Sequence, residues 1–462
     1  MTKAQNFYDQ RFSVAPMLDW TTRYCRAFHR QLSKHAVLYT EMVATSTILH
    51  SKSDYLFFNP ENEGNVVLQL GGSDPKQFAQ VGKMLAEKAE LYPYYGININ
   101  VGCPSPRVTS GSFGACLMAE PDLVAQCADA LLTSCDIPVS IKTRIGIDDY
   151  DDFDFLADFL DPLVEIGISD FTIHARKALL NGLSPKENRE IPPLNYQRVY
   201  DLKDEFPDIN ITINGGINTL YEASEHLKHV EGVMMGREAF NNPAVLLGVD
   251  ALLFDDYAND FSRYHGIFDD TLTLDHQYAF FPDSVNLHAD SHDSFTMRVA
   301  KSISGGRNLL STYDPLLEKL DLLTTLIHKK AAERLEQGLT EKRAFALEML
   351  QHKREPGKHA PKSHISDAAR FKRAQQIATG QAMFDALERL RPYWEKEVKR
   401  GVAISHLFKP VLGAFNGLPG AKQFRRYLSI HGFNNDANLD VLLYAIDLMY
   451  DKFLQFIESS VD

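Results

Sequence analysis

Short strand-like segments recur through residues 12–237, and each is followed by a stretch long enough for a helix. Several are almost continuous runs of Val, Ile and Leu, which is typical of parallel strands buried on both faces. The intervening stretches show helical spacing, as in 121–132, where Pro121 stands at the opening. The predicted strands are Phe12–Leu18, Leu38–Met42, Val66–Leu70, Gly96–Gly102, Val139–Ile145, Asp170–Ala175, Asn210–Gly216 and Gly232–Arg237.

Eight β/α units of this length predict a TIM barrel, an α/β fold in which eight parallel strands are ringed by helices. A doubly wound sheet is the alternative, but no G-x-G-x-x-G motif follows the first predicted strand. Nearly every predicted strand ends in polar side chains or glycines. In a barrel these ends meet at one face, where the active site lies.

The pattern changes after Asn242-Pro243, which gives three predicted domains. A catalytic barrel is expected at 10–250, and an unassigned, partly helical insertion at 257–370, where 313–352 carries a leucine stripe. An all-α domain is expected at 371–462. Its predicted helices are at about 368–400, 404–416, 421–428 and 439–457.

Composition narrows the class of protein. No apolar run is long enough to cross a bilayer, and the N-terminus has no apolar signal core. Five cysteines without a C-x-x-C pair fit a reducing cytoplasm, so we expect a cytoplasmic protein. The net charge of −13 argues against a generally basic nucleic-acid coat, and we expect neither DNA nor a membrane as a partner.

A metal site is not expected. His288 and His292 are four residues apart, but they stand in a predicted loop with no further ligand pattern.

Two predicted strand ends suit a phosphorylated ligand. Asn214-Gly215-Gly216 and Gly236-Arg237 follow the seventh and eighth strands, where barrels commonly bind phosphate through backbone N–H groups. Lys142 and Gln69 project from other strands toward the same space and suit the pyrimidine edge of a flavin. Lys142 as a Schiff-base lysine is the alternative, and the phosphate loops together with Gln69 favour flavin mononucleotide (FMN).

Cys103 stands in Asn100-Val101-Gly102-Cys103-Pro104, directly after an apolar strand. A small buried apolar side chain is the usual fate of a free cysteine. With a flavin in the barrel, a positioned thiol can instead protonate the carbon left by hydride addition to a double bond. Asn100 is placed to orient a substrate carbonyl.

The C-terminal region supplies a local basic face. Lys422 and Arg425 are three residues apart in a predicted helix, so they share one side of it. A solvated surface is the alternative interpretation.

The ordered motifs resemble one family, the flavin-dependent tRNA-dihydrouridine synthases. The segment 183–194 resembles the A-type subfamily, which acts on uridines 20 and 20a of the tRNA D-loop. The motifs are Ala15–Trp20, Tyr39–Met42, Leu68–Gly72, Asn100–Pro104, Lys142–Gly146, His174–Lys177, Asn214–Gly216 and Gly236-Arg237. The likeness covers about 10–250 and resumes near 380–430, whereas 257–370 has no recognised counterpart.

The resemblance implies an FMN site and a reaction. FMN would bind at Pro16, Met17, Leu18, Gln69, Lys142, His174, Asn214, Gly215, Gly216, Gly236 and Arg237. Cys103 would donate a proton to uracil C5 while hydride goes to C6, and NADPH would reduce the flavin.

The resemblance also implies a tRNA substrate bound by a monomer. The expected RNA contacts are Asn100, Lys186, Arg189, Lys422 and Arg425. Ser405–Lys409 replaces an expected Thr-Arg-His-type stretch, and Lys409 would supply the charge there. The alternatives are a flavin barrel that reduces a free pyrimidine and a non-catalytic tRNA-binding protein.

Overall fold

The computed structural model describes residues 10–105, 111, 113–254, 367–434 and 437–461. These residues divide into two compact units. The first contains the described residues up to Arg30, then His35–Asn218 and Glu222–Glu238. The second contains Gln31–Lys34, Thr219–Tyr221 and the described residues from Ala239 onward.

The first unit is a closed parallel β-barrel. Its sheet order is β2-β1-β9-β8-β7-β6-β5-β4-β3, and an additional pairing of β2 with β4 closes the ring. β3 pairs only with β4, so eight strands form the ring and the predicted TIM barrel is confirmed. The strands are β1 (Phe12–Val14), β2 (Val37–Tyr39), β3 (Val43–Ala44), β4 (Val66–Gly71), β5 (Gly96–Asn100), β6 (Val139–Arg144), β7 (Asp170–His174), β8 (Asn210–Asn214) and β9 (Gly232–Met235).

Two strands differ from the sequence-based expectation. The predicted first strand, 12–18, ends at Val14, because residues from Met17 onward turn back and Thr21 N–H donates to the Met17 carbonyl at 2.9 Å. The predicted second strand, 38–42, ends at Tyr39 in β2, and the short β3 begins only at Val43. In both places the chain leaves the sheet to form a loop at the carboxyl end of the barrel.

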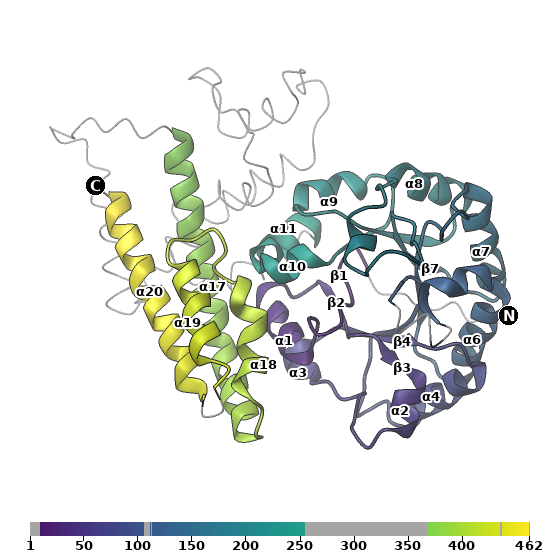
Figure 1. Cartoon of the computed structure of the whole chain (residues 1–462), viewed down its shortest axis with the longest axis horizontal. Coiled ribbons are helices and arrows are strands. Elements are labelled where there is room, and N and C mark those ends of the chain that lie inside the picture. Colours follow the sequence, from purple (N-terminus) through teal and green to yellow (C-terminus); the bar gives the residue numbers. More distant parts are fainter. Residues whose placement is uncertain (1–9, 106–110, 112, 255–366, 435–436, 462) are drawn as a thin grey trace. The chain divides into compact units, whose positions relative to one another are not determined.

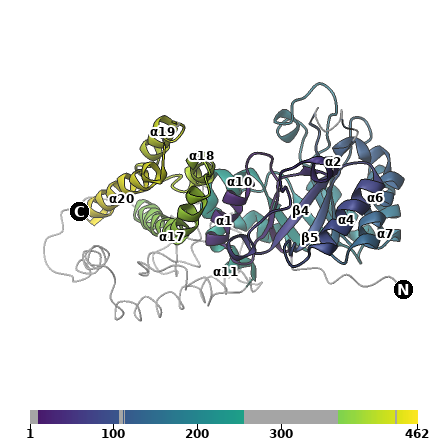
Figure 2. The same cartoon turned by 90° about the horizontal axis from the view of Figure 1, so that it is seen from below.

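Helices of the first unit cover the outside of the barrel (Figures 1 and 2). Side-chain N-caps fix several of them: Asp74, Asp152 and Asn195 accept from backbone N–H groups of α4, α7 and α8. The α-helices are α1 (Arg23–Leu32), α2 (Thr45–His50), α3 (Pro60–Glu63), α4 (Pro75–Glu87), α6 (Pro121–Ser134), α7 (Phe153–Glu165), α8 (Tyr196–Glu205), α9 (Leu220–His226) and α10 (Arg237–Asn241). Two 3-10 turns are η1 (Gly114–Ala119) and η2 (Glu187–Arg189).

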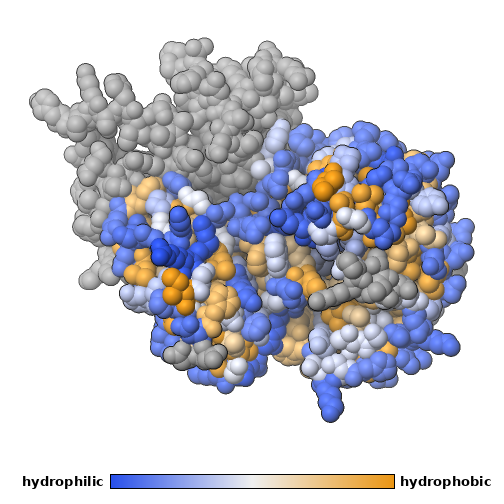
Figure 3. Space-filling view, in the orientation of Figure 1, coloured by the Kyte–Doolittle hydropathy of each residue, from blue (hydrophilic) through white to orange (hydrophobic). Residues whose placement is uncertain are grey.

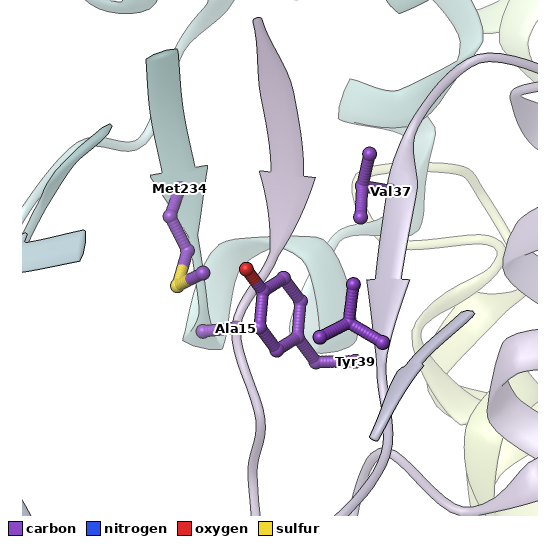
Figure 4. Packing of buried hydrophobic residues seen from close by; sticks show 5 residues of the cluster. Ala15, Val37, Tyr39 and Met234 are labelled. Atoms are coloured by element: carbon purple, nitrogen blue, oxygen red, sulfur yellow. The ribbon is translucent and has the colours of Figure 1, made fainter. Parts of the chain in front are cut away.

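The inside of the barrel is packed with side chains. Val37, Tyr39, Val67 and Met234 come from three different strands and meet Ala15, and all five are buried (Figure 4). β4 and β5 are buried at every position, as expected for strands covered on both faces. In the space-filling view the rim of the barrel unit is largely hydrophilic, with hydrophobic residues gathered nearer its centre (Figure 3).

The second unit is helical. An aromatic cluster forms its core, in which Phe384 lies 4.7 Å from Phe415 and 5.3 Å from Phe453 between ring centroids. Gly380 allows a close approach, because a Cβ there would lie 2.4 Å from the Phe453 ring. The elements are η3 (Pro243–Gly248), α11 (Val249–Phe254), α17 (Asp367–Lys399), α18 (Ile404–Phe408), η6 (Lys409–Gly413), α19 (Ala421–His431) and α20 (Leu439–Val461).

The predicted C-terminal helices are confirmed, with one difference: 404–416 is divided into α18 and η6, because Pro410 stands inside it. Most of the predicted insertion, with the 313–352 helix and His288 and His292, lies outside the described residues. Among the described helices, none is long and apolar enough to cross a membrane.

Candidate functional site

Polar side chains at the strand ends form a linked network, as the sequence predicts. Gln69 on β4 donates to Asn98 Oδ1 at 2.8 Å, and Asn100 on β5 donates to Gln69 Oε1 at 3.1 Å. On the strand next to β5, Lys142 of β6 donates to Asn214 Oδ1 on β8 at 3.1 Å. The network therefore draws side chains from four strands toward one end of the barrel.

Asn100 fixes the loop that carries Cys103. Its Oδ1 accepts from the N–H of Gly102 at 3.2 Å and from the N–H of Cys103 at 3.0 Å. The side chain is only 8% exposed, while Cys103 is partly exposed. Cys103 thus sits, partly exposed, on a turn whose backbone is held by a buried amide.

Three of the other cysteines belong to the packed interior. Cys25, Cys127 and Cys135 are buried. Burial raises the pKa of the Cys127 thiol to about 12 and raises the pKa of the other two as well. These three thiols are therefore inert at neutral pH.

Cations surround the Cys103 loop. Lys142, Arg144 and Arg189 lie near enough to Cys103 to interact with it electrostatically. Burial, followed by repulsion from Arg144, lowers the pKa of Lys142 to about 7. Lys142 can therefore lose its proton near neutral pH when no anion is beside it.

His174 on β7 is held as a neutral imidazole. Burial is the largest cause that lowers its pKa, and repulsion from Arg144 and Lys142 adds to it. A neutral ring nitrogen can donate or accept a single hydrogen bond without bringing a charge into the site.

Gly215 and Gly216 adopt backbone angles that suit only glycine, with φ of +116° and +72°. A Cβ on Gly215 would lie 2.7 Å from His174, and one on Gly216 would lie 2.5 Å from Leu194. Tyr196 anchors this turn, because its hydroxyl donates to the Gly215 carbonyl at 2.7 Å.

Gly236 is different, because there is room for a Cβ beside it. A Cβ there would meet only Ala15 and the Met17 sulfur, at 3.5 and 3.6 Å. This brings the end of β9 next to the loop after β1, where the predicted FMN residues Pro16, Met17 and Leu18 lie. Leu18 is 60% exposed, and Glu41 fixes the same loop by accepting from the N–H of Asp19 at 2.6 Å.

Two arginines, Arg176 and Arg237, add positive charge at the carboxyl end of the barrel. Arg237 pairs with Glu190 at 2.9 Å, and both side chains are exposed. Arg176 donates to the Pro192 carbonyl, but its buried Nε has no partner among the described residues. A buried donor without an acceptor is costly and suits an anionic ligand.

These features fit a flavin mononucleotide. The backbone N–H groups of the glycine turns, together with Arg237, can take the phosphate. Lys142 and Gln69 supply donors for the ring edge. Within the described ranges, no group of three or more His, Cys, Asp or Glu residues could hold a metal ion.

Lys186 and Arg189, two of the predicted RNA contacts, are exposed on and beside η2. Asn188 holds this segment from beneath: it is fully buried, and its side chain exchanges hydrogen bonds of 2.8 and 2.9 Å with the Leu179 backbone. The two basic side chains therefore stand on a fixed turn.

Lys422 and Arg425 lie on α19 in the helical unit, with Lys422 exposed and Arg425 partly so. Lys422 is in the first turn, where there is no acidic residue. A cation there opposes the helix dipole at a cost of roughly 0.3–1 kcal/mol, which favours a binding role over a stabilising one. Lys409 lies 5.8 Å from the Phe433 ring centroid.

Arg144 and Arg176 lie within the motifs Lys142–Gly146 and His174–Lys177, but neither was assigned a role from the sequence. Arg144 is two residues after Lys142 on β6, and Arg176 is two residues after His174. Since alternate residues of a strand share a face, this spacing was the available signal.

Comparisons with known proteins agree with this geometry. The family model for dihydrouridine synthase (Dus) matches residues 13–268. A tRNA-dihydrouridine(20/20a) synthase from Pasteurella multocida (strain Pm70) is 59% identical over 250 residues, which is 54% of this chain and 75% of that protein.

Two further relatives match nearly the whole chain, and both are named tRNA-dihydrouridine(20/20a) synthase. The one from Yersinia pestis is 39% identical over 447 residues, which is 96% of this chain and 93% of that protein. The one from Escherichia coli (strain K12) is 38% identical over 451 residues, 97% of this chain and 94% of that protein. The matched spans therefore run through 257–370, and the chain belongs to the dihydrouridine synthase family.

Proposed function

We propose that this protein reduces uridine to 5,6-dihydrouridine at positions 20 and 20a of the tRNA D-loop. The names of the relatives support the substrate and the positions. The observation that carries the reaction is the partly exposed Cys103, whose backbone is held by Asn100 at the end of β5 among the cations of the barrel mouth.

Cys103 is the proposed general acid. Its thiol gives a proton to C5 of the uracil ring, and a positioned acid of this kind contributes roughly 10²–10⁴-fold to a rate. The hydrogen bond from the Cys103 N–H to Asn100 at 3.0 Å supports the role, because it fixes the position of the thiol before substrate arrives.

FMN is the proposed cofactor, and NADPH is the proposed reductant. When bound, FMN supplies the hydride for C6 of the uracil. The residues proposed to hold it are Pro16, Met17, Leu18, Gln69, Lys142, His174, Asn214, Gly215, Gly216, Gly236 and Arg237. The glycine turns, the room for a Cβ at Gly236 and the unpartnered Nε of Arg176 support this assignment.

The proposed tRNA contacts have two roles. Lys186, Arg189, Lys422 and Arg425 bind phosphates, which positions the RNA without reading its sequence. Asn100 contacts the target base through its second amide hydrogen, because the first is donated to Gln69. The base must leave its stack to reach the barrel, at a cost of a few kcal/mol.

The proposed domains have separate roles in the reaction and in RNA binding. The barrel at 10–250 carries the chemistry and the helical domain at 371–462 adds RNA contacts, with 257–370 between them. We propose that the protein acts on tRNA as a cytoplasmic monomer.

A deletion strain tests the proposal. Mapping of dihydrouridine in its tRNA should show loss at positions 20 and 20a, restored by the wild-type gene but not by a Cys103→Ala variant. Dihydrouridine that persists at both positions in the deletion strain would contradict the proposal. Purified protein that reduces free uridine as readily as tRNA would favour a free pyrimidine as the substrate.

A further inference from the structure

Arg144 joins three separate segments at the barrel mouth. Its Nε donates to the Gly102 carbonyl at 2.8 Å, and its Nη1 donates to the carbonyls of Lys177 at 3.1 Å and Asn188 at 3.2 Å. Gly102 immediately precedes Cys103, Lys177 lies in the loop after β7, and Asn188 lies in η2. One guanidinium therefore ties the proposed acid's loop to the segment that carries Lys186 and Arg189.

The chemical setting of Arg144 is unusual for a buried arginine. The residue is 4% exposed, and all three acceptors are neutral backbone carbonyls. Buried arginines are normally paired with a carboxylate, yet in the part of the chain that the structure describes Arg144 has no ion pair. Its burial is a cost to stability that a purely structural cross-link between loops does not require.

The hydrogen bond from Arg144 Nε to the Gly102 carbonyl helps to hold the Cys103 loop. β6 also holds Val101, whose N–H donates to the Lys142 carbonyl at 2.8 Å and whose carbonyl accepts from Thr143 Oγ1 at 3.2 Å. These bonds end at Val101, however. Beyond it, the Gly102 carbonyl accepts from Arg144 Nε, the Cys103 carbonyl accepts from the Ala115 N–H at 3.0 Å, and Asn100 holds the N–H groups of both residues.

At the other end of the link, hydrogen bonds of Asn188 anchor the η2 segment. The Asn188 side chain is fully buried and bonded to the backbone of Leu179 at both its oxygen and its nitrogen. Arg144 Nη1 donates to the backbone carbonyl of Asn188. A displacement of η2 would thus be carried through Asn188 and the Arg144 guanidinium to Gly102.

We propose that Arg144 is a positioning residue that couples the RNA-facing segment with Lys186 and Arg189 to the loop of Cys103. Seating of the RNA backbone on η2 then sets the placement of the thiol against the uracil ring. This inference rests on the proposed function, because it assigns a role within that same reaction.

The test compares Arg144→Lys and Arg144→Ala with the wild type in single turnover. Enzyme carrying reduced flavin is mixed with tRNA that lacks dihydrouridine, and dihydrouridine is measured over time. Lysine keeps the charge but cannot span three carbonyls, so both variants should react about 100-fold more slowly, the scale of an ångström misplacement. In Arg144→Lys, FMN content and the rate of flavin reduction by NADPH should stay at wild-type values, because lysine keeps the positive charge that acts on Lys142 and His174.

Arg30→Lys is the matched control. Arg30 also donates to three backbone carbonyls, those of Glu63 at 2.8 Å, Ala36 at 2.8 Å and Asn65 at 3.4 Å, but none belongs to the Cys103 loop. Its single-turnover rate should equal that of the wild type. Added guanidinium ion should speed Arg144→Ala and leave Arg30→Ala unchanged, which a loss of general stability would not produce.

A double-mutant cycle tests the coupling itself. Lys186→Ala should slow the wild type by a larger factor than it slows Arg144→Lys, because the link from η2 to Cys103 is already broken in the latter. Additive effects, or an Arg144→Lys variant with the wild-type rate, would overturn the inference. If the wild-type enzyme formed no dihydrouridine in tRNA, that result would instead contradict the proposed function.

Discussion

Lys142 lies at the barrel mouth and can gain or lose its proton near neutral pH. Burial lowers its pKa to about 7, and its one hydrogen bond within the barrel is to the neutral Asn214 amide. An anion placed beside it would favour the protonated form and raise the pKa again. The free protein therefore holds Lys142 ready to take up a proton when an anionic ligand binds.

Competitive labelling of the flavin-free protein with an amine reagent should reveal this pKa. Only the unprotonated amine reacts, so Lys142 should gain reactivity as the pH rises through about 7, whereas exposed lysines do so near about 10.4. Bound FMN should protect Lys142. Labelling of Lys142 that begins only near pH 10 would show that burial does not act on it as described.

Asn100 and Arg144 show what residue-level reasoning could and could not reach. The strand-end position of Asn100 was visible in the sequence, but its main role, holding the N–H groups of Gly102 and Cys103, depends on the turn geometry. Arg144 bonds to carbonyls 33 to 44 residues away in the chain. Such contacts follow from the meeting of loops in the folded barrel, which no local pattern encodes.

At the scale of elements, the strands were predictable because burial on both faces leaves long Val, Ile and Leu runs. The exact ends of the strands were not predictable. For example, β1 stops at Val14, where the chain turns into the Met17 loop. The glycine turn after β8 was recognisable from Asn214-Gly215-Gly216. The room for a Cβ beside Gly236 was not recognisable from the sequence, because the neighbouring β1 loop sets it.

Gly236→Ala is expected to separate flavin binding from folding. The added methyl has ordinary contacts with Ala15 and Met17, so the melting temperature of the flavin-free protein should not change. It fills the space proposed for the ligand, and FMN affinity should fall at least about tenfold, equal to about 1.4 kcal/mol. Titration with FMN and thermal melting give the two quantities.

Gly216→Ala provides the contrast. Its Cβ would lie 2.5 Å from Leu194, and its φ of +72° is strained for alanine, so this variant should also melt at a lower temperature without flavin. If Gly236→Ala bound FMN as tightly as the wild type, the phosphate would not lie at the end of β9.

The basic pair on α19 belongs to the same scale. Lys422→Ala combined with Arg425→Ala should weaken tRNA binding and lower the slope of log affinity against log salt by about 1.5, the value for two phosphate contacts. Flavin content should not change. Lys76→Ala combined with Lys83→Ala, two exposed lysines on α4, is the control. Equal salt slopes for both double variants would assign Lys422 and Arg425 to the solvated surface.

At the scale of the whole molecule, the barrel and the helical unit were both foreseen from the sequence, because repeated β/α units and helical spacing are local signals. The compact units divide at Glu238, inside α10, rather than at the end of a linker. That boundary depends on which core each residue joins, and no change in composition marks it.

The account makes one claim about the molecule as a whole: a barrel holding a flavin delivers uridine of tRNA to a positioned thiol. Single-turnover reaction of reduced enzyme with tRNA that lacks dihydrouridine tests it most directly. The wild type should form dihydrouridine in the D-loop, and Cys103→Ala with equal flavin content should do so roughly 10²–10⁴-fold more slowly. Equal rates for the two proteins, or no dihydrouridine with the wild type, would contradict it.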